Sequence, residues 1–134
     1  MRPPDIAAHT VTKLRASDGT ALGTYAVGAN PYGVAFDGAN IWVTNQDSDT
    51  VTKLRASDGA NLGTFGVGAG PFGVAFDGAN VWVTNDRSNT VNKLRASDGV
   101  ILGTYTVGMN PFGVAFDGAN VWATNGASRT VSKL

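Results

Sequence analysis

The chain has 134 residues, of which 43% are hydrophobic and 15% charged, a composition typical of a folded globular domain and unlike that of disordered or membrane-spanning chains. Ten Lys and Arg balance ten Asp, so the basic surface that attracts nucleic acids or anionic membranes is missing and we expect neither as a partner. The absence of cysteine excludes disulfides and thiolate metal sites.

Residues 1–10 form an irregular N-terminal segment that matches nothing further along the chain. Because the segment has no apolar run, we expect no signal peptide, and no other stretch is long and apolar enough to cross a membrane. We therefore expect a soluble protein, in a compartment that the sequence leaves open. His9 is the only histidine, so one chain cannot build a zinc cluster or a set of general bases from repeated histidines.

From residue 11 onward the sequence consists of one repeated unit. Three full units cover residues 11–50, 51–90 and 91–130, and residues 131–134 begin a fourth. The first two units differ at only ten positions (20, 21, 25, 26, 30, 32, 41, 46, 47 and 49). A period of this length is typical of repeat architectures in which each unit is one small supersecondary structure.

Each unit alternates short strand-forming stretches with tight turns. In the first full set, strands are predicted at 32–36, 41–45, 51–55 and 62–67, and Asp-Gly turns separate the first from the second and the third from the fourth. Four antiparallel strands per repeat unit predict one blade of a β-propeller. We name these strands A, B, C and D, from the innermost to the outermost.

A recurrent tryptophan marks strand B of every unit. Strands A and B are largely apolar on both faces, as expected when each sheet is stacked between two others. We therefore interpret these residues as structural, filling the space between blades, rather than as a stacking platform for a ligand. They are Trp42, Trp82 and Trp122.

These motifs together resemble the YVTN-type β-propeller repeat, with related blades in the virginiamycin B lyase-like and NHL groups. The shared features are Thr-Val, the Asp-Gly turn, Val-Gly before Pro-x-Gly-Val-Ala, and the closing Val-Thr-Asn, and they span about 120 of the 134 residues. Trp stands where the family usually has Tyr, and Ala123 replaces Val in the last unit. The resemblance implies the fold but not the function, because such propellers serve as enzymes, surface proteins and binding scaffolds. The lyase relatives are expected to use His with acidic residues and magnesium, and the blades here contain no matching His.

Three blades are too few to close a ring, since closed propellers usually have four to eight. If each end left about 500 Å² of apolar surface exposed, roughly 25 cal/mol per Å² would amount to more than ~20 kcal/mol for both ends. The recognisable pattern begins at strand C and finishes after strand B, so A and B of one copy can pair with C and D of another. We therefore expect a homodimer that closes a six-bladed ring, in which residues 131–134 are surplus and are displaced, frayed or paired elsewhere.

One glycine pattern suggests a nucleotide site and is rejected. Gly68, Gly70 and Gly73 have the spacing GxGxxG, which binds a pyrophosphate only between a strand and a helix. The middle glycine is Asn30 and Asn110 in the other units, and a strand follows instead of a helix. This segment is therefore the D–A loop between two blades.

The B–C loops (46–49, 86–89 and 126–129) share one rim with the D–A loops, and the units differ most there. That divergence indicates either neutral drift or the tailoring of a binding face. The asparagines that end strand B either cap the neighbouring loop or point at a ligand. The candidate binding residues of this rim are Asn30, Asn45, Asp47, Asp49, Asn85, Asp86, Arg87, Asn110, Asn125 and Arg129.

The sequence favours a non-enzymatic scaffold or binding module that self-associates and takes a small polar ligand or a partner at this rim. The alternative is a metal-dependent hydrolase or lyase with a channel-mouth site built from Asp and Asn of two subunits. No catalytic residue and no cofactor is predicted, and both the metal and the ligand are left open.

Overall fold

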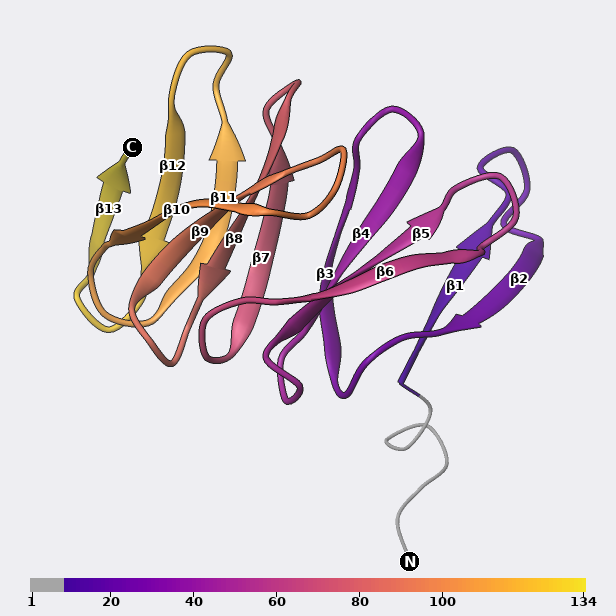
Figure 1. The fold of residues 1–134 in the computed structure, drawn as a ribbon, viewed down its shortest axis with the longest axis horizontal. Coiled ribbons are helices and arrows are strands. Elements are labelled where there is room, and N and C mark those ends of the chain that lie inside the picture. Colours follow the sequence, from indigo (N-terminus) through magenta and orange to yellow (C-terminus); the bar gives the residue numbers. More distant parts are fainter. Residues whose placement is uncertain (1–8) are drawn as a thin grey trace, which may run out of the picture.

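The computed structural model describes residues 9–134 as thirteen strands in four antiparallel sheets (Figure 1). The first sheet pairs β1 (Thr10–Leu14) with β2 (Ala21–Ala26). The second holds β3 (Pro31–Phe36), β4 (Asn40–Asn45), β5 (Thr50–Arg55) and β6 (Asn61–Gly66). The third holds β7 (Pro71–Phe76), β8 (Asn80–Asn85), β9 (Thr90–Arg95) and β10 (Ile101–Thr106). The fourth holds β11 (Pro111–Phe116), β12 (Val121–Asn125) and β13 (Thr130–Lys133).

The predicted four-strand blade is confirmed in the second and third sheets. Strand order within each sheet follows chain order, and every expected strand of the first full set is found to within one residue at each end. Most of the N-terminal segment 1–10 lies outside the described residues, and β1 begins at Thr10, one residue before the expected start.

The turns between strands A and B are closed by an aspartate. Asp37 Oδ1 accepts the backbone N–H of Ala39 at 3.0 Å and of Asn40 at 2.8 Å, while Gly38 has a φ of +100°. Only glycine adopts such a backbone without strain. The same arrangement recurs at Asp77 and Asp117, so this turn chemistry fixes the hairpin in every unit.

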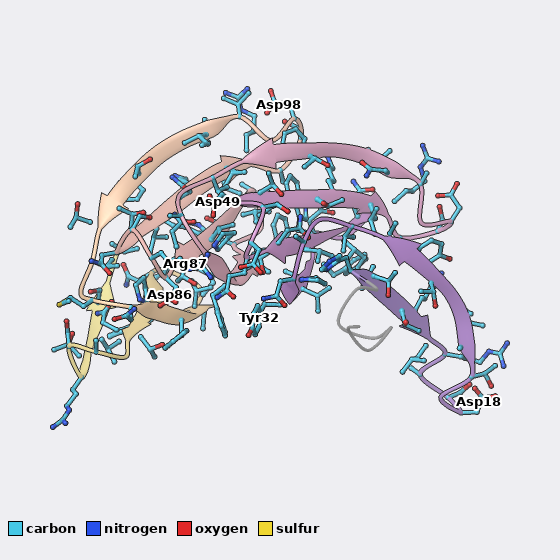
Figure 2. All side chains as sticks on the ribbon, turned by 90° about the horizontal axis from the view of Figure 1, so that it is seen from below. Asp18, Tyr32, Asp49, Asp86, Arg87 and Asp98 are labelled. Atoms are coloured by element: carbon cyan, nitrogen blue, oxygen red, sulfur yellow. The ribbon has the colours of Figure 1, made fainter. Side chains whose placement is uncertain are left out.

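The sheets follow one another around an arc rather than a closed ring. The innermost strands β3, β7 and β11 lie next to one another, and the outer strands fan away from them (Figure 2). Figure 2 shows Tyr32 on the concave side of the arc and Asp98 on its convex side. The central axis of the fold therefore runs past strand A of each blade.

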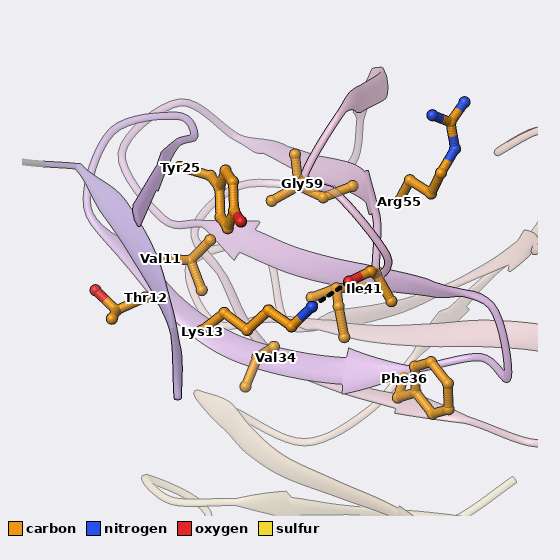
Figure 3. Close-up of a pocket in the computed structure, with 11 residues that line it drawn as sticks. Val11, Thr12, Lys13, Tyr25, Val34, Phe36, Ile41, Arg55 and Gly59 are labelled. Carbon is orange, nitrogen blue, oxygen red and sulfur yellow. Dashed lines mark hydrogen bonds between the residues drawn. The ribbon is translucent and has the colours of Figure 1, made fainter. Parts of the chain in front are cut away.

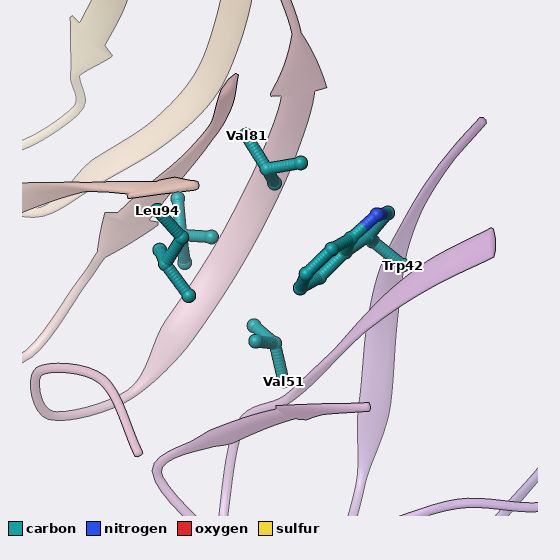
Figure 4. Packing of buried hydrophobic residues seen from close by; sticks show 5 residues of the cluster. Trp42, Val51, Val81 and Leu94 are labelled. Atoms are coloured by element: carbon teal, nitrogen blue, oxygen red, sulfur yellow. The ribbon is translucent and has the colours of Figure 1, made fainter. Parts of the chain in front are cut away.

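The core lies between neighbouring sheets, not within a single sheet. Trp42 of the second sheet is fully buried with Val51 of its own sheet and with Val81 and Leu94 of the third (Figure 4). Trp82 packs in the same way against Val121 of the fourth sheet, in a second cluster. Burial of large apolar side chains between sheets is the main stabilising term in such a fold.

Two hydrogen bonds tie the second sheet to the third. Thr44 Oγ1 donates to the Phe72 carbonyl at 2.8 Å, and Lys53 Nζ donates to the Ala96 carbonyl at 2.8 Å. The same lysine ammonium lies 5.3 Å from the centre of the Trp42 ring, a favourable cation–π distance. The lysine bond recurs between the first two sheets and the threonine bond between the last two.

The two ends of the arc are incomplete blades. The first sheet has only strands of the C and D type, and the last has A and B strands with β13 paired antiparallel to β12. The expected surplus segment 131–134 thus occupies the C position of its own chain. Across residues 9–134, no helix is long and apolar enough to span a membrane.

Candidate binding rim

The fourth residue of the first two B–C loops bonds to the next blade. Asp49 Oδ1 accepts the N–H of Gly70 at 2.9 Å, and Asn89 Oδ1 accepts that of Asn110 at 3.0 Å. At the start of the arc His9 Nδ1 accepts the N–H of Asn30 at 3.0 Å. All three acceptor residues have positive φ, which turns the side chain toward the neighbouring loop. Among the predicted rim residues, Asp49 therefore bonds within the fold.

The asparagine that ends strand B lies inside the blade. Asn45 is fully buried; its Oδ1 accepts the N–H of Gly28 at 3.0 Å and its Nδ2 donates to Thr52 Oγ1 at 2.8 Å. Asn85 and Asn125 are buried too and donate in the same way to the hydroxyls or amide of strand C. Asn45 thus holds the first D–A loop onto its blade, whereas Oδ1 of Asn85 and of Asn125 accepts no hydrogen bond among the described residues. All three side chains are buried and do not reach the rim surface.

Charged and amide side chains meet on the outside of the rim. Arg87 donates to Asp47 at 3.1 Å across two neighbouring blades, with both side chains about half exposed. Asn110 Nδ2 donates to Asp86 Oδ1 at 3.1 Å, again across two blades. These are the predicted candidates that the structure brings together at the surface.

The remaining candidates lie at either end of this group. Asn30 Nδ2 donates to Gln46 Oε1 at 3.3 Å, and Gln46 is not among the predicted site residues. Arg129 has a φ of +56° in the last B–C loop and is exposed. It occupies the position at which Asp49 and Asn89 accept a bond from the next blade.

A row of aromatic rings lies beside these loops, on the innermost strands that face the central axis. Tyr32 and Phe72 are stacked with ring centres 4.3 Å apart, and Phe72 meets Phe112 edge-on at 4.7 Å. They line a hollow of about 260 Å³ together with the following glycine and valine of each innermost strand. These rings were not predicted from the sequence, although one signal was available: every unit places an aromatic residue directly after the proline that opens strand A.

The opposite rim is built from hydrogen-bonded carboxylates. Trp42 Nε1 donates to Asp37 Oδ2 at 2.8 Å, and Trp122 Nε1 donates to Asp117 Oδ2 at 2.7 Å. The bond from Trp122, with two backbone N–H bonds, lowers the pKa of Asp117 to about 2. Partial burial acts to raise the pKa of Asp37 and Asp77, but the bonds from tryptophan and backbone outweigh it and leave the pKa below its ordinary value.

Within one chain, the described residues form no cluster suited to a metal ion. Over residues 9–134 no group of three or more His or Asp side chains converges to hold an ion. The alternative of a hydrolase or lyase whose metal is shared between two subunits stays a prediction. The arrangement that is present can stack a flat ring and offer it donors and acceptors.

The comparisons with known proteins agree in fold only. No family model matches the chain, and no curated protein matches it in sequence. Among solved structures it is similar to hydrazine synthase from Kuenenia stuttgartiensis (TM-score 0.76, 22% identity, 96% of this chain and 43% of that one). It is also similar to a functionally unknown protein from Desulfotomaculum acetoxidans DSM 771 (TM-score 0.75, 19% identity, 93% and 47%) and to U3-55K (TM-score 0.73, 13% identity, 95% and 46%).

The chain thus spans less than half the length of each of these structures. Hydrazine synthase and U3-55K have propeller-type folds, and the chain described here is an all-β protein of the same propeller-like architecture.

Proposed function

We propose that the protein is a non-enzymatic β-propeller binding module that completes its ring by self-association and holds a small polar ligand at the rim of the B–C and D–A loops. The observation that carries the ligand part is the row of Tyr32, Phe72 and Phe112 next to the polar loops. Exposed aromatic faces at the axis of a fold offer a large contact area to a flat ligand. The ligand is therefore a small molecule with one flat apolar face.

The polar side chains set what surrounds that face. The pair of Arg87 and Asp47 is about half exposed, and such a pair contributes little to folding stability. A ligand can therefore take up either charge at little cost to the fold. Asp86 and Asn110 add an acceptor and an amide a blade further on, which suits a ligand with several hydroxyl or amide groups.

The self-association part follows from the blade count. The chain supplies two complete blades and parts of two more, and both ends of the arc expose apolar side chains, with Phe36 56% and Trp122 38% exposed. Surfaces of this kind mark sites of protein association. Two copies would supply the strands of a six-bladed ring.

The ligand proposal is tested by saturation-transfer NMR. The probes are monosaccharides, nucleosides and free amino acids, and the proteins are the wild type, Phe72→Ala and the control Leu102→Ala, which alters an exposed side chain on β10. We expect at least one probe to be saturated by the wild type and the control but not by Phe72→Ala. Equal signals from all three proteins, or no signal from any probe, would contradict a site at the aromatic row.

A further inference from the structure

A largely apolar cavity of about 220 Å³ lies between the first two sheets (Figure 3). Its walls are formed by side chains of β1 and β2 on one side and of β3, β4 and β5 on the other. A cavity of roughly 150 Å³ holds a benzene molecule. This one therefore has room for an aromatic side chain.

The cavity has a filled counterpart one repeat further along the chain. Nine other side chains belong to the Trp42 cluster, and the equivalents of seven of them, one repeat unit earlier, line the cavity. The equivalents from the first sheet are Val11 and Tyr25, and those from the second sheet and its loops are Val34, Phe36, Ile41, Leu54 and Ala56. The cavity is therefore lined like the surroundings of a buried tryptophan, but no tryptophan of the described residues fills it.

The chain's own N-terminal sequence does not supply that tryptophan. The position one repeat unit before Trp42 is Arg2, and the next two are Pro3 and Pro4, where the other units have Val or Ala and then Thr. Proline has no N–H to donate to a strand ladder and is confined to edge strands or bulges. The segment therefore lacks both the indole and the sequence of a B strand.

At the other end of the arc, the equivalent tryptophan is partly exposed. Trp122 is 38% exposed, whereas Trp42 is fully buried. Its indole N–H is already bonded to Asp117, so burying the ring leaves no polar group unpaired. Its blade has no D strand, and the aromatic side chain that packs on Trp42 and Trp82 comes from strand D, as Phe65 and Tyr105. In the cavity the corresponding side chain is Tyr25 on β2.

Two further features of the last blade indicate that its outer face lacks a neighbouring blade. In the described residues Thr84 Oγ1 donates to the carbonyl of Phe112 in the next blade, but Thr124 Oγ1 only accepts a bond, from Gly113. Gly73 lies so close to the next blade that an added Cβ would collide with the Phe112 carbonyl, while at Gly113 it would meet only Thr124. The carbonyl equivalent to that of Phe112 in the first complete blade belongs to Tyr32.

We propose that Trp122 of one copy of this chain fills the cavity of a second copy, and that β11 and β12 join β1 and β2 of that copy as one blade. This names the interface of the self-association proposed above and rests on it. Exchanged both ways by a twofold axis, the contact closes the arc into a ring without a free end. Thr124 then donates to Tyr32 of the partner subunit, as Thr44 and Thr84 donate within one chain.

In a single copy, β13 occupies the position beside β12 that β1 of the second copy takes in the dimer. It pairs with β12 along one edge, as β1 pairs with β2, but β1 also reaches the second sheet through the bond from Lys13 Nζ to the Ala56 carbonyl at 3.0 Å. Asn125 Nδ2 donates to Thr130 and Ser132 hydroxyls, and β1 offers Thr10 and Thr12 at the equivalent positions. The exchange therefore replaces like contacts with like, and β13 is the strand that leaves.

The interface is tested by light scattering and sedimentation of four full-length variants. In one copy a Cβ added at Gly113 would meet only Thr124, at 3.3 Å from its Oγ1, and Val34 is 59% exposed. We therefore expect Gly113→Ala and Val34→Glu to stay folded but monomeric where the wild type is dimeric. Trp122→Ala should weaken the dimer on the order of 100-fold or more. Val100→Glu is the control, because Val100 is 47% exposed in a C–D turn outside the interface, and it should associate like the wild type.

A mixing experiment distinguishes loss of the interface from misfolding, because association is regained only if both variants are folded. Val34→Glu retains an intact Trp122 and Trp122→Ala retains an intact cavity, so their equimolar mixture regains one wild-type contact per pair. We expect this mixture to associate more tightly than either variant alone. Ser132→Pro, which weakens the pairing of β13 with β12, should tighten the dimer.

The outcomes that contradict the proposal are distinguishable. A wild-type chain that stays monomeric at every concentration overturns both this interface and the self-association itself. A wild-type dimer that Gly113→Ala, Val34→Glu and Trp122→Ala all leave intact overturns the interface alone, and so does a mixture that associates no better than its components. Open assemblies that grow with concentration overturn the closed twofold ring.

Discussion

The space between the second and third sheets and the space between the first and second sheets are lined by equivalent side chains. They differ because the first sheet lacks strands A and B, and with them the tryptophan. On the side of the third sheet, Trp42 is in place, Val81 is fully buried, and Val74 and Phe76 are partly buried. On the side of the first sheet, the equivalents Val34 and Phe36 are 59% and 56% exposed. Burial in this fold is therefore a property of having a neighbour on each side, not of the repeat sequence itself.

The largest expected effect is the difference in stability lost when Trp42, between two sheets, and Trp122, at the open end of the arc, are each replaced by alanine. We expect Trp42→Ala to lower the free energy of unfolding by about 3–5 kcal/mol, because it empties a packed core. Trp122→Ala should lower it by less, since the ring is 38% exposed and its loss empties no closed core. Both are measured by urea denaturation in the Val34→Glu background, which we expect to be monomeric. Equal losses would show that the two sites are not different in packing.

The pH dependence of stability tests a feature that is the same in every A–B hairpin, in contrast to the spaces between sheets. The folded pKa of Asp37, Asp77 and Asp117 lies below the ordinary value, near 2 for Asp117. A lowered folded pKa stabilises the fold above the unfolded pKa of about 4, and that stabilisation is lost as the pH falls toward the folded value. We expect the free energy of unfolding to be level above pH 5 and to fall between pH 4 and pH 2.

Asp117→Asn is the matched variant for this prediction. It removes one titrating carboxylate without changing the length of the side chain, so the acid-induced loss should become smaller while the fold at neutral pH is kept. Denaturation curves followed by tryptophan fluorescence at each pH measure it. An unchanged acid profile would mean that other carboxylates control the transition.

The smallest effect is expected at the rim. Arg87→Ala removes the ion pair with Asp47, whose two side chains are about half exposed, and pairs of this kind contribute about 0–1 kcal/mol. We expect thermal unfolding of Arg87→Ala to differ from that of the wild type by at most a few degrees. A large loss would show that the rim loops depend on this bridge between blades for their structure.

The local features of the fold were predictable from the sequence, and the contacts between blades were not. Asp-Gly turns and short apolar stretches predicted the strands of the blade because both signals act within a few residues. The bond from Lys53 to Ala96 and the stacking of Tyr32 on Phe72 depend on the angle between two sheets, on which no single segment carries information.

The candidate site was predictable only in part, for the same reason. The loops of the rim were located from their position in the unit, yet the burial of Asn45 and the partner of Asp49 follow from how the next blade approaches. The Trp–Asp bond within a hairpin had a usable signal, since the indole follows the aspartate by five residues in all three units. The aromatic row had one too, in the residue after each proline.

The joint between blades also bears on how such a protein grows. Because the joints after the second and third sheets share the same threonine bond and the same tryptophan packing, duplicating one unit adds a blade without requiring a new interface. The number of blades is then set by the curvature at which the ends meet rather than by the identity of any contact. Two copies fused end to end in one polypeptide would then build the proposed ring with one interface between chains fewer.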